Sequence, residues 1–432
     1  MPSDVLAIAD RLWNGELSTS TIHPVDHIGG FVEITDGVGF CPSFANVSSF
    51  ATEDGLVLVD TGSAPLAQIV HDDIRTWSPA RLNTAVYSHG HIDHVFGVPV
   101  WEEEAVARRW AAPEVIAHHA LPARFDRYIF TAGYNTIINR RQFGFTDLQW
   151  PTEYRYPDRT YHDTLELSVG GRDFSLRHEK GETDDHTVTW QPESRVLCCG
   201  DLFIWASPNA GNPQKVQRYP REWAVALRRM LELEAEFLLP GHGFPVIGAD
   251  RVRTALTDTA DLLDSLVDQT LAVMNAGGRL DDAIHSVRVP AALESRPFLQ
   301  PVYDEPEFIV HSVWRQYGGW WDGNPATLQP APERALATEL AELAGGAGAL
   351  ADRALELLAL SDQGGAGAEG ALRLAGHLAE HAWLAQPDDE GVQRARQQVF
   401  AARASRATST MARGVFNWAA NESTAPPHPH PH

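Results

Sequence analysis

The sequence predicts an α/β layered domain followed by an all-helical domain. Between residues 30 and 87, short apolar runs that resemble strands alternate with a helical pattern, and strand–helix–strand order is typical of a layered α/β core. From residue 251 onward, apolar positions recur at helical spacing. A chain of 432 residues is also longer than one hydrophobic core usually organises. We therefore expect an α/β domain over residues 1–250, a helical domain over 251–424 and a disordered His/Pro tail over 425–432.

Strands are predicted where apolar and β-branched residues lie between turn residues. A helix is predicted over 67–77, and a second begins near residue 101. The stretch 121–165 is rich in aromatics and arginine and is expected to be irregular, forming a wall or lid of a site. In the second domain, the glycine pairs at 345–346 and 364–365 are predicted to separate helices. The predicted strands cover residues 30–34, 56–59, 84–87, 115–117, 174–176, 187–190, 195–199 and 237–239.

Composition excludes several classes of protein. Hydrophobic residues make up 44% and charged residues 21%, as in soluble globular proteins. The formal net charge of −23 opposes binding to nucleic acid or to an anionic membrane surface. Three cysteines are too few for a disulfide scaffold, and the first residues resemble no signal peptide. No apolar window approaches the length of a membrane span. We expect a cytoplasmic protein that binds neither nucleic acid nor membranes.

The segment Ser88–His94, read Ser-His-Gly-His-Ile-Asp-His, contains three imidazoles and one carboxylate. It follows a predicted strand, so it forms a loop at a strand end. Imidazole and carboxylate are the ligands that zinc and neighbouring divalent metals prefer. Such a loop can direct His89 and His91 to one metal ion and Asp93 and His94 to a second.

Further candidate ligands follow or precede other predicted strands. His186 precedes a strand, Asp201 follows the apolar strand 195–199, and His242 follows the strand 237–239 in a Pro-Gly-His-Gly segment. Near His186, the acidic residues Glu182, Asp184 and Asp185 either tune that imidazole or form a polar turn. Asp60, after the strand 56–59, either orients a ligand imidazole or caps the following helix.

The His-x-His-x-Asp-His pattern resembles the signature of the metallo-β-lactamase superfamily. The resemblance implies a four-layer αβ/βα sandwich with two divalent metal ions. Zinc is expected, although iron and manganese accept the same ligands. Two such ions lower the pKa of a shared water, and the bridging hydroxide is the expected nucleophile. By resemblance, His89, His91 and His186 hold the first metal, Asp93, His94 and His242 hold the second, and Asp201 bridges them; Asp93 and Asp201 are the expected catalytic carboxylates.

The segment Tyr317–Pro325, with its Trp-Asp-Gly-Asn-Pro sequence, resembles the dimerisation domain of the alkyl sulfatases in this superfamily. The resemblance implies a homodimer paired through the C-terminal helices. The chain departs from the secreted alkyl sulfatases at two ligand positions. That group uses glutamate at the third metal motif and as the bridging ligand, whereas His186 and Asp201 are expected there in this chain.

The expected activity is hydrolysis of a small anionic ester, with an alkyl sulfate as the leading substrate. Substrate-binding residues are sought in the stretch 121–165, because arginine pairs well with sulfate or carboxylate. Three alternatives remain open: hydrolysis of a lactone, thioester, carboxylic ester or phosphoester; a lyase or redox reaction on the same scaffold; and a dimeric binding protein without activity. The candidate substrate residues are Tyr134, Asn139, Arg140 and Arg141.

Overall fold

The protein, in a computed structural model that describes residues 5–423, divides into two compact units. The first unit is the chain up to Ala132 together with Pro151–Trp320, and the second is Gly133–Trp150 together with the chain from Trp321. The expected boundary at 250/251 does not coincide with this division, because helix α7 (Ala249–Asn275) buries its apolar side chains in the core of the first unit. The expected tail at 425–432 lies outside the described residues.

The first unit contains two β-sheets. The seven-stranded sheet runs β1 to β7 in chain order, antiparallel from β1 to β4 and parallel from β4 to β7. The six-stranded sheet has the order β13-β12-β11-β10-β9-β8, and only β11 and β12 are parallel. The strands of the first sheet are β1 (Val32–Thr35), β2 (Val38–Cys41), β3 (Val47–Thr52), β4 (Gly55–Val59), β5 (Leu82–Val86), β6 (Glu114–His118) and β7 (Arg159–Tyr161). Those of the second are β8 (Thr164–Val169), β9 (Arg172–His178), β10 (Thr187–Gln191), β11 (Val196–Gly200), β12 (Phe237–Pro240) and β13 (Val246–Ile247).

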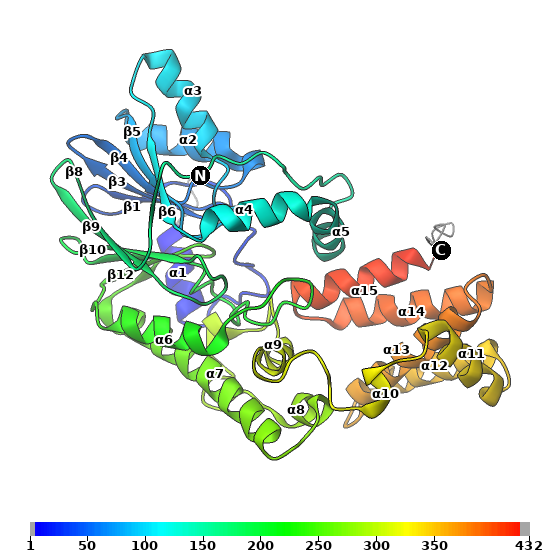
Figure 1. The fold of residues 1–432 in the computed structure, drawn as a ribbon. Helices are drawn as coiled ribbons and strands as arrows, with labels where there is room; N and C mark the ends of the chain where they lie inside the picture. Colours follow the sequence, from blue (N-terminus) through cyan, green and yellow to red (C-terminus); the bar gives the residue numbers. More distant parts are fainter. Residues whose placement is uncertain (1–4, 424–432) are drawn as a thin grey trace. The chain divides into compact units, whose positions relative to one another are not determined.

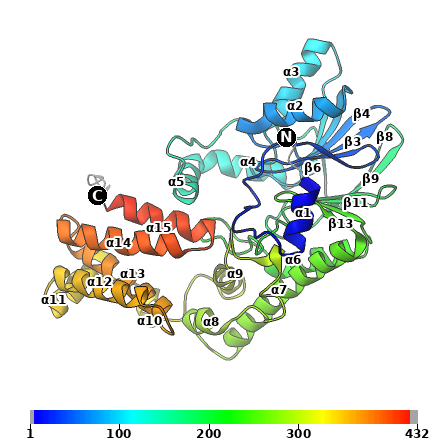
Figure 2. The same ribbon diagram turned by 180° about the vertical axis from the view of Figure 1, so that it is seen from behind.

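Alternation along the strands explains the layers. On β4, Val57 and Val59 belong to one hydrophobic cluster, whereas Leu56 and Leu58 belong to another, because successive side chains point to opposite faces. Helices α2 (Ala67–Trp77) and α3 (Val98–Arg108) cover the outer face of the first sheet, and α6 (Pro220–Leu231) and α7 cover the second (Figures 1 and 2). The predicted four-layer αβ/βα sandwich is confirmed. The unit also contains α1 (Val5–Trp13), α4 (Leu121–Phe130), α8 (Leu280–Ser286), α9 (Pro306–Gly318) and the short 3₁₀ turns η1 (Ala64–Leu66) and η2 (Pro297–Leu299).

The prediction of an irregular stretch over 121–165 is wrong for its first half, which forms α4 and α5 (Ala132–Phe143). In α4, Leu121, Phe125 and Tyr128 are buried at helical spacing, so the signal was present in the sequence. Helix α5 buries Asn135, Asn139 and Gln142 beside a single isoleucine. Because its buried face is mostly polar, no apolar stripe marks it as a helix.

The second unit is helical throughout the described residues. The predicted helix breaks are confirmed: Gly345 ends α11 in the left-handed conformation, and Gly364 and Gly365 lie between α12 and α13. Within this unit, α5 lies against α15, where a Cβ at Gly414 would meet the carbonyl oxygen of Gln142. Its remaining helices are α10 (Pro325–Leu328), α11 (Glu333–Ala344), α12 (Ala347–Asp362), α13 (Ala368–Ala385), α14 (Glu390–Arg406) and α15 (Thr410–Glu422).

The Trp-Asp-Gly-Asn-Pro segment forms a closed turn before α10. Asp322 Oδ1 accepts a hydrogen bond from the Asn324 N–H at 2.8 Å, and Trp321 Nε1 donates to the Asn324 carbonyl at 2.8 Å. Asn324 then caps α10 through Ala326 N at 3.1 Å, with Pro325 at the first helical position. Trp321, Asp322, Asn324 and Pro325 therefore each have a structural role in starting the helical unit.

Among residues 5–423, no helix combines the length and the apolar character that crossing a membrane requires.

Four histidines pack together at the ends of β6 and β9. The rings of His118 and His178 stack with centroids 3.7 Å apart, and His119 Nδ1 lies 2.9 Å from His118 Nε2. The ring of His162 lies 3.9 Å from that of His119. His118 is buried, and burial followed by the neighbouring His178 and His119 lowers its pKa to about 4.

We expect His118 to make the native state less stable in mild acid. Between pH 6.5 and 4 the unfolded chain protonates this residue while the native state does not, so stability falls as the pH drops through that window. The contribution is about 2 kcal/mol at pH 4.5. Denaturant unfolding at pH 7 and 4.5 should show a smaller loss in His118→Gln than in the parent. An equal loss in both proteins would contradict the prediction.

Candidate metal centre

The candidate metal centre lies where two pairs of parallel strands end. In the first sheet, Asp60 follows β4, and the loop that carries His89 follows its parallel neighbour β5. In the second sheet, Asp201 follows β11 and His242 follows its parallel neighbour β12. Because parallel neighbours end at the same edge of a sheet, residues distant in sequence come together there.

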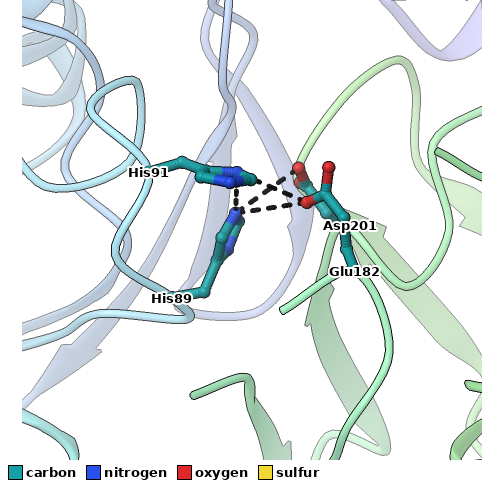
Figure 3. Close-up of side chains that lie close together, drawn as sticks. All are labelled: His89, His91, Glu182 and Asp201. Carbon is teal, nitrogen blue, oxygen red and sulfur yellow. Dashed lines mark hydrogen bonds and ion pairs between the residues drawn. The ribbon is translucent and has the colours of Figure 1, made fainter. Parts of the chain in front are cut away.

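The first group of potential ligands contains His89, His91, Glu182 and Asp201 (Figure 3). The Nε2 atom of His89 lies 2.7 Å from Nδ1 of His91. Oε2 of Glu182 lies 3.5 Å from the His89 nitrogen and 3.4 Å from the His91 nitrogen. Asp201 Oδ2 lies 3.6 Å from His89 Nε2. Two imidazoles and two carboxylates thus converge on one point.

The second group contains Asp93, His94 and His242. Asp93 Oδ2 lies 3.6 Å from His94 Nε2 and 3.4 Å from His242 Nε2. The carboxylate of Asp201 also reaches this group, at 3.4 Å from His94 Nε2 and 3.3 Å from His242 Nε2. Asp201 therefore lies between the two groups, as expected for a bridging ligand.

His186, expected from the sequence as a ligand, is not in either of these two groups, and its role as a ligand stays a prediction. Its Nε2 atom lies 3.0 Å from the carbonyl oxygen of Cys199 on β11. Its ring instead stacks on that of His89, with centroids 4.8 Å apart and planes 17° apart. Glu182, four residues earlier in the same loop, provides the side chain that joins His89 and His91.

Outside the ligands, Asp60 orients the histidine loop. Its Oδ2 accepts from His94 Nδ1 at 2.7 Å and from the Ser88 hydroxyl at 2.7 Å, while Oδ1 accepts from the Ser88 N–H at 2.7 Å. The His94 ring is thereby fixed with Nε2 facing the second group. Of the two alternatives for Asp60, the structure favours the orientation of an imidazole, since Ser63 is the residue that begins the next turn.

Burial and neighbouring charges shift the pKa values of the histidines and of Asp201 in the centre. Burial lowers the pKa of His89 and of His91 well below the ordinary value. Burial also disfavours a charged His94 and His242, but neighbouring carboxylates, Asp201 first, raise the pKa of His94 far above its ordinary value and that of His242 to about 9. Burial would raise the pKa of Asp201, yet His242 and His94 hold it well below its usual range. In the metal-free chain, the charged imidazoles of the second group compensate the carboxylates.

Three buried atoms of the centre have no hydrogen-bond partner among the described residues: His94 Nε2, Glu182 Oε2 and Asp201 Oδ1. Buried polar atoms are nearly always paired, so such atoms indicate a missing partner. All three face the points on which the two groups converge. Imidazole nitrogens and carboxylate oxygens at these positions fit two divalent cations.

A close backbone approach keeps Asp201 in place. Gly241 precedes His242, and a Cβ atom there would lie 2.1 Å from Asp201 Oδ1 and 2.7 Å from the carbonyl carbon of Gly200. The Pro-Gly-His-Gly segment therefore requires glycine before the histidine, because any side chain would displace the carboxylate between the two groups.

Several residues around the centre were not found from the sequence. Arg218 is buried, donates to the Glu182 carbonyl at 2.5 Å, and has Nη2 3.4 Å from Glu182 Oε1. Asn209 donates to the same Glu182 oxygen. Lys215 and Tyr303 interact electrostatically with Asp93 and Glu182. A single arginine or lysine carries no periodic signal, so no sequence pattern marks Arg218 or Lys215.

The candidate substrate residues of α5 lie in the second unit and have partners there. Asn139 is buried and donates to the Asn135 carbonyl at 2.7 Å, and Arg140 Nε donates to the Leu148 carbonyl at 2.8 Å. The Arg141 guanidinium lies 5.5 Å from the centre of the Trp418 ring. Tyr134 is exposed. Their role in substrate binding stays a prediction.

Comparisons with known proteins cover both units. A model of the metallo-beta-lactamase superfamily matches residues 42–242, and a model of the alkyl sulfatase dimerisation family matches residues 279–425. The chain is 27% identical over 315 residues to a linear primary-alkylsulfatase of a Pseudomonas species, covering 68% of this chain and 59% of the relative. It is 26% identical over 376 residues to an alkyl/aryl-sulfatase of Saccharomyces cerevisiae, covering 78% and 58%. The chain thus spans less than two thirds of the length of these relatives.

The fold is also found among solved structures. A stereoselective inverting sec-alkylsulfatase from Pseudomonas sp. superposes with a TM-score of 0.80 at 23% identity, over 92% of this chain and 66% of the other. Fold, ligand geometry and family matches agree with the resemblance that the histidine loop and the Trp-Asp-Gly-Asn-Pro segment indicated. The chain therefore carries a metallo-β-lactamase superfamily domain and an alkyl sulfatase dimerisation domain.

Proposed function

We propose that this protein is a metal-dependent hydrolase of alkyl sulfate esters. The observation that carries the proposal is the position of Asp201 between two groups of ligands, with the buried Arg218 paired to Glu182 of the first group. The names of the relatives, linear primary-alkylsulfatase and alkyl/aryl-sulfatase, support a sulfate ester as substrate. The match to the metallo-beta-lactamase superfamily supports divalent metal ions as cofactors.

Two metal ions are proposed, and zinc is the proposed identity, since imidazole and carboxylate suit zinc well while also accepting iron or manganese. When bound, such ions lower the pKa of water and neutralise charge on oxygen. The proposed ligands replace His186 by Glu182. They are His89, His91 and Glu182 for the first ion, Asp93, His94 and His242 for the second, and Asp201 for both.

The chain's own residues keep this arrangement rigid. Asp60 holds the His94 ring, and Arg218 with Asn209 holds the Glu182 carboxylate that completes the first group. Asp93 lies between His94 and His242, so its carboxylate faces the point on which the second group converges. Preorganised groups of this kind need no rearrangement when charge develops in the transition state.

An anionic substrate needs a cation to overcome the net charge of −23. We propose Arg218 and Lys215 for this role. Arginine keeps its charge at any physiological pH. Lys215 differs, because burial and the nearby Arg218 lower its pKa to about 7 despite the opposing effect of Asp93. Occupation by a sulfate would favour the charged ammonium.

We further propose that the protein forms a homodimer through its C-terminal helices. The match to the alkyl sulfatase dimerisation family supports this. Helices α11 to α13 also expose large apolar side chains, which monomeric proteins usually cover. The exposed leucines are Leu336, Leu343, Leu360 and Leu374.

The proposal is tested by elemental analysis of the purified protein together with release of sulfate from a medium-chain alkyl sulfate. We expect about two zinc ions per chain and measurable sulfate release. Two zinc ions without sulfate release would move the substrate to a carboxylic ester, lactone, thioester or phosphoester. Iron instead of zinc would favour a lyase or redox reaction, and a folded protein without metal would contradict the proposal.

A further inference from the structure

A buried ion pair lies behind the first group of ligands. Arg124 of α4 and Asp185 are both buried, and Arg124 Nε donates to Asp185 Oδ1 at 2.8 Å. A buried ion pair is seldom the most stabilising way to fill a core, because both charges lose their hydration. Its position relative to the ligands therefore suggests a role other than stability alone.

The second oxygen of Asp185 contacts the histidine loop. Asp185 Oδ2 accepts a hydrogen bond from the Gly90 N–H at 2.9 Å, and Gly90 lies between His89 and His91. Asp185 itself belongs to the loop of Glu182, three residues later in the chain. One carboxylate thus connects helix α4, the loop with two ligand imidazoles and the loop with the ligand carboxylate.

The contact leaves no room for a side chain at Gly90. A Cβ atom there would lie 2.8 Å from Cδ of Arg124 and 3.1 Å from Asp185 Oδ2. The histidine loop therefore packs in direct contact with the ion pair. A shift of Asp185 would move Gly90 and, with it, the two imidazoles on either side.

We propose that Asp185, held by Arg124, is a positioning residue that fixes the distance between the His89–His91 loop and Glu182. It thereby sets the affinity of the first group of ligands for its metal ion. This inference rests on the proposed function, since it concerns the metal that the first group would hold. Partners that orient metal ligands commonly change metal affinity about 10–100-fold when they are replaced.

Asp185→Asn is the sharpest test, because both carboxylate oxygens accept hydrogen bonds from fixed donors. An amide offers one oxygen and places its N–H₂ against either the Gly90 N–H or the Arg124 guanidinium. Asp184→Asn is the matched control. Asp184 is the adjacent residue and also pairs with Arg124, but its side chain is 46% exposed.

The experiment is titration of the metal-free full-length proteins with zinc chloride, with stepwise dissociation constants from calorimetry or chelator competition. We expect Asp185→Asn to weaken zinc binding by the first group by about 10–100-fold and zinc binding by the second group much less. Asp184→Asn should have the same dissociation constants as the parent. Thermal unfolding of the metal-free proteins distinguishes positioning from general stability. If Asp185→Asn does not fold, Arg124→Lys replaces it as the test. This variant keeps the charge but loses the planar guanidinium, and we expect it to lower the affinity of the first group for zinc.

The inference is overturned if the parent binds two zinc ions and Asp185→Asn binds them as the control does. It is also overturned if the affinities for both zinc ions fall equally while the metal-free variant becomes correspondingly less stable. A parent protein that binds no zinc would instead contradict the proposed function itself, so the two failures are distinguishable.

Discussion

Replacing Glu182 by glutamine should remove the metal of the first group and lower kcat for an alkyl sulfate by more than about 100-fold, the upper range for residues that only orient ligands. The reason is geometric and electrostatic. Glu182 Oε2 lies within 3.5 Å of the facing nitrogens of His89 and His91, and it is buried without a hydrogen-bond partner. An amide at this position retains the shape but loses the negative charge. Elemental analysis and initial rates on the same sample measure both effects.

His186→Gln is the matched comparison for this variant. His186 is the ligand expected from the sequence, but its Nε2 atom lies 3.0 Å from the Cys199 carbonyl, and a glutamine amide can still donate there. We expect this variant to keep both metals and most of its activity. The opposite pattern, with metal lost in His186→Gln and kept in Glu182→Gln, would restore the sequence-based assignment. Thermal unfolding of both variants excludes misfolding as the cause.

Removing the metals with a chelator should abolish hydrolysis and destabilise the first unit. Without metal ions, the carboxylates of Asp93, Glu182 and Asp201 lie close together, and only protein side chains, Arg218 and protonated imidazoles, offset their charge. Each metal present at 1,000 times its dissociation constant stabilises the native state by about 4 kcal/mol. Denaturant unfolding with and without zinc measures this difference.

Adding single metal ions back to the chelated protein identifies the metal that the enzyme uses. We expect zinc to restore both activity and stability, whereas manganese or iron restoring the higher rate would change the assignment of the cofactor but not of the ligands. Full hydrolysis by the demetallated protein would contradict a role of the metals in the reaction. The comparison must be made at one ionic strength, because surface charge pairs are screened by salt.

Much of this site was predictable because its residues are neighbours in sequence or lie at recognisable strand ends. His89, His91, Asp93 and His94 lie within six consecutive positions, so one folded loop is enough to bring their side chains close together. Asp201 and His242 follow the parallel strands β11 and β12, whose ends coincide once the sheet forms. The third motif was harder to assign, because the loop between β9 and β10 contains an imidazole and several carboxylates, and ligand spacing alone does not choose between them. Periodicity gives no information about which of them turns inward.

By itself, the sequence predicted an α/β layered core, the histidine loop and the segment that starts the helical unit, while the four-layer sandwich was implied by the family resemblance. These features depend on local patterns: alternation in strands, ligand spacing in one loop, and the turn and cap formed by Trp321 to Asn324. Only the tertiary structure decided that Glu182 faces the ligands while His186 contacts a neighbouring strand, and that α5 belongs to the helical unit. Both outcomes depend on contacts between segments far apart in the chain: the approach of β11 to the β9–β10 loop, and the approach of Gly414 to Gln142. Such contacts leave no periodic trace in either segment alone.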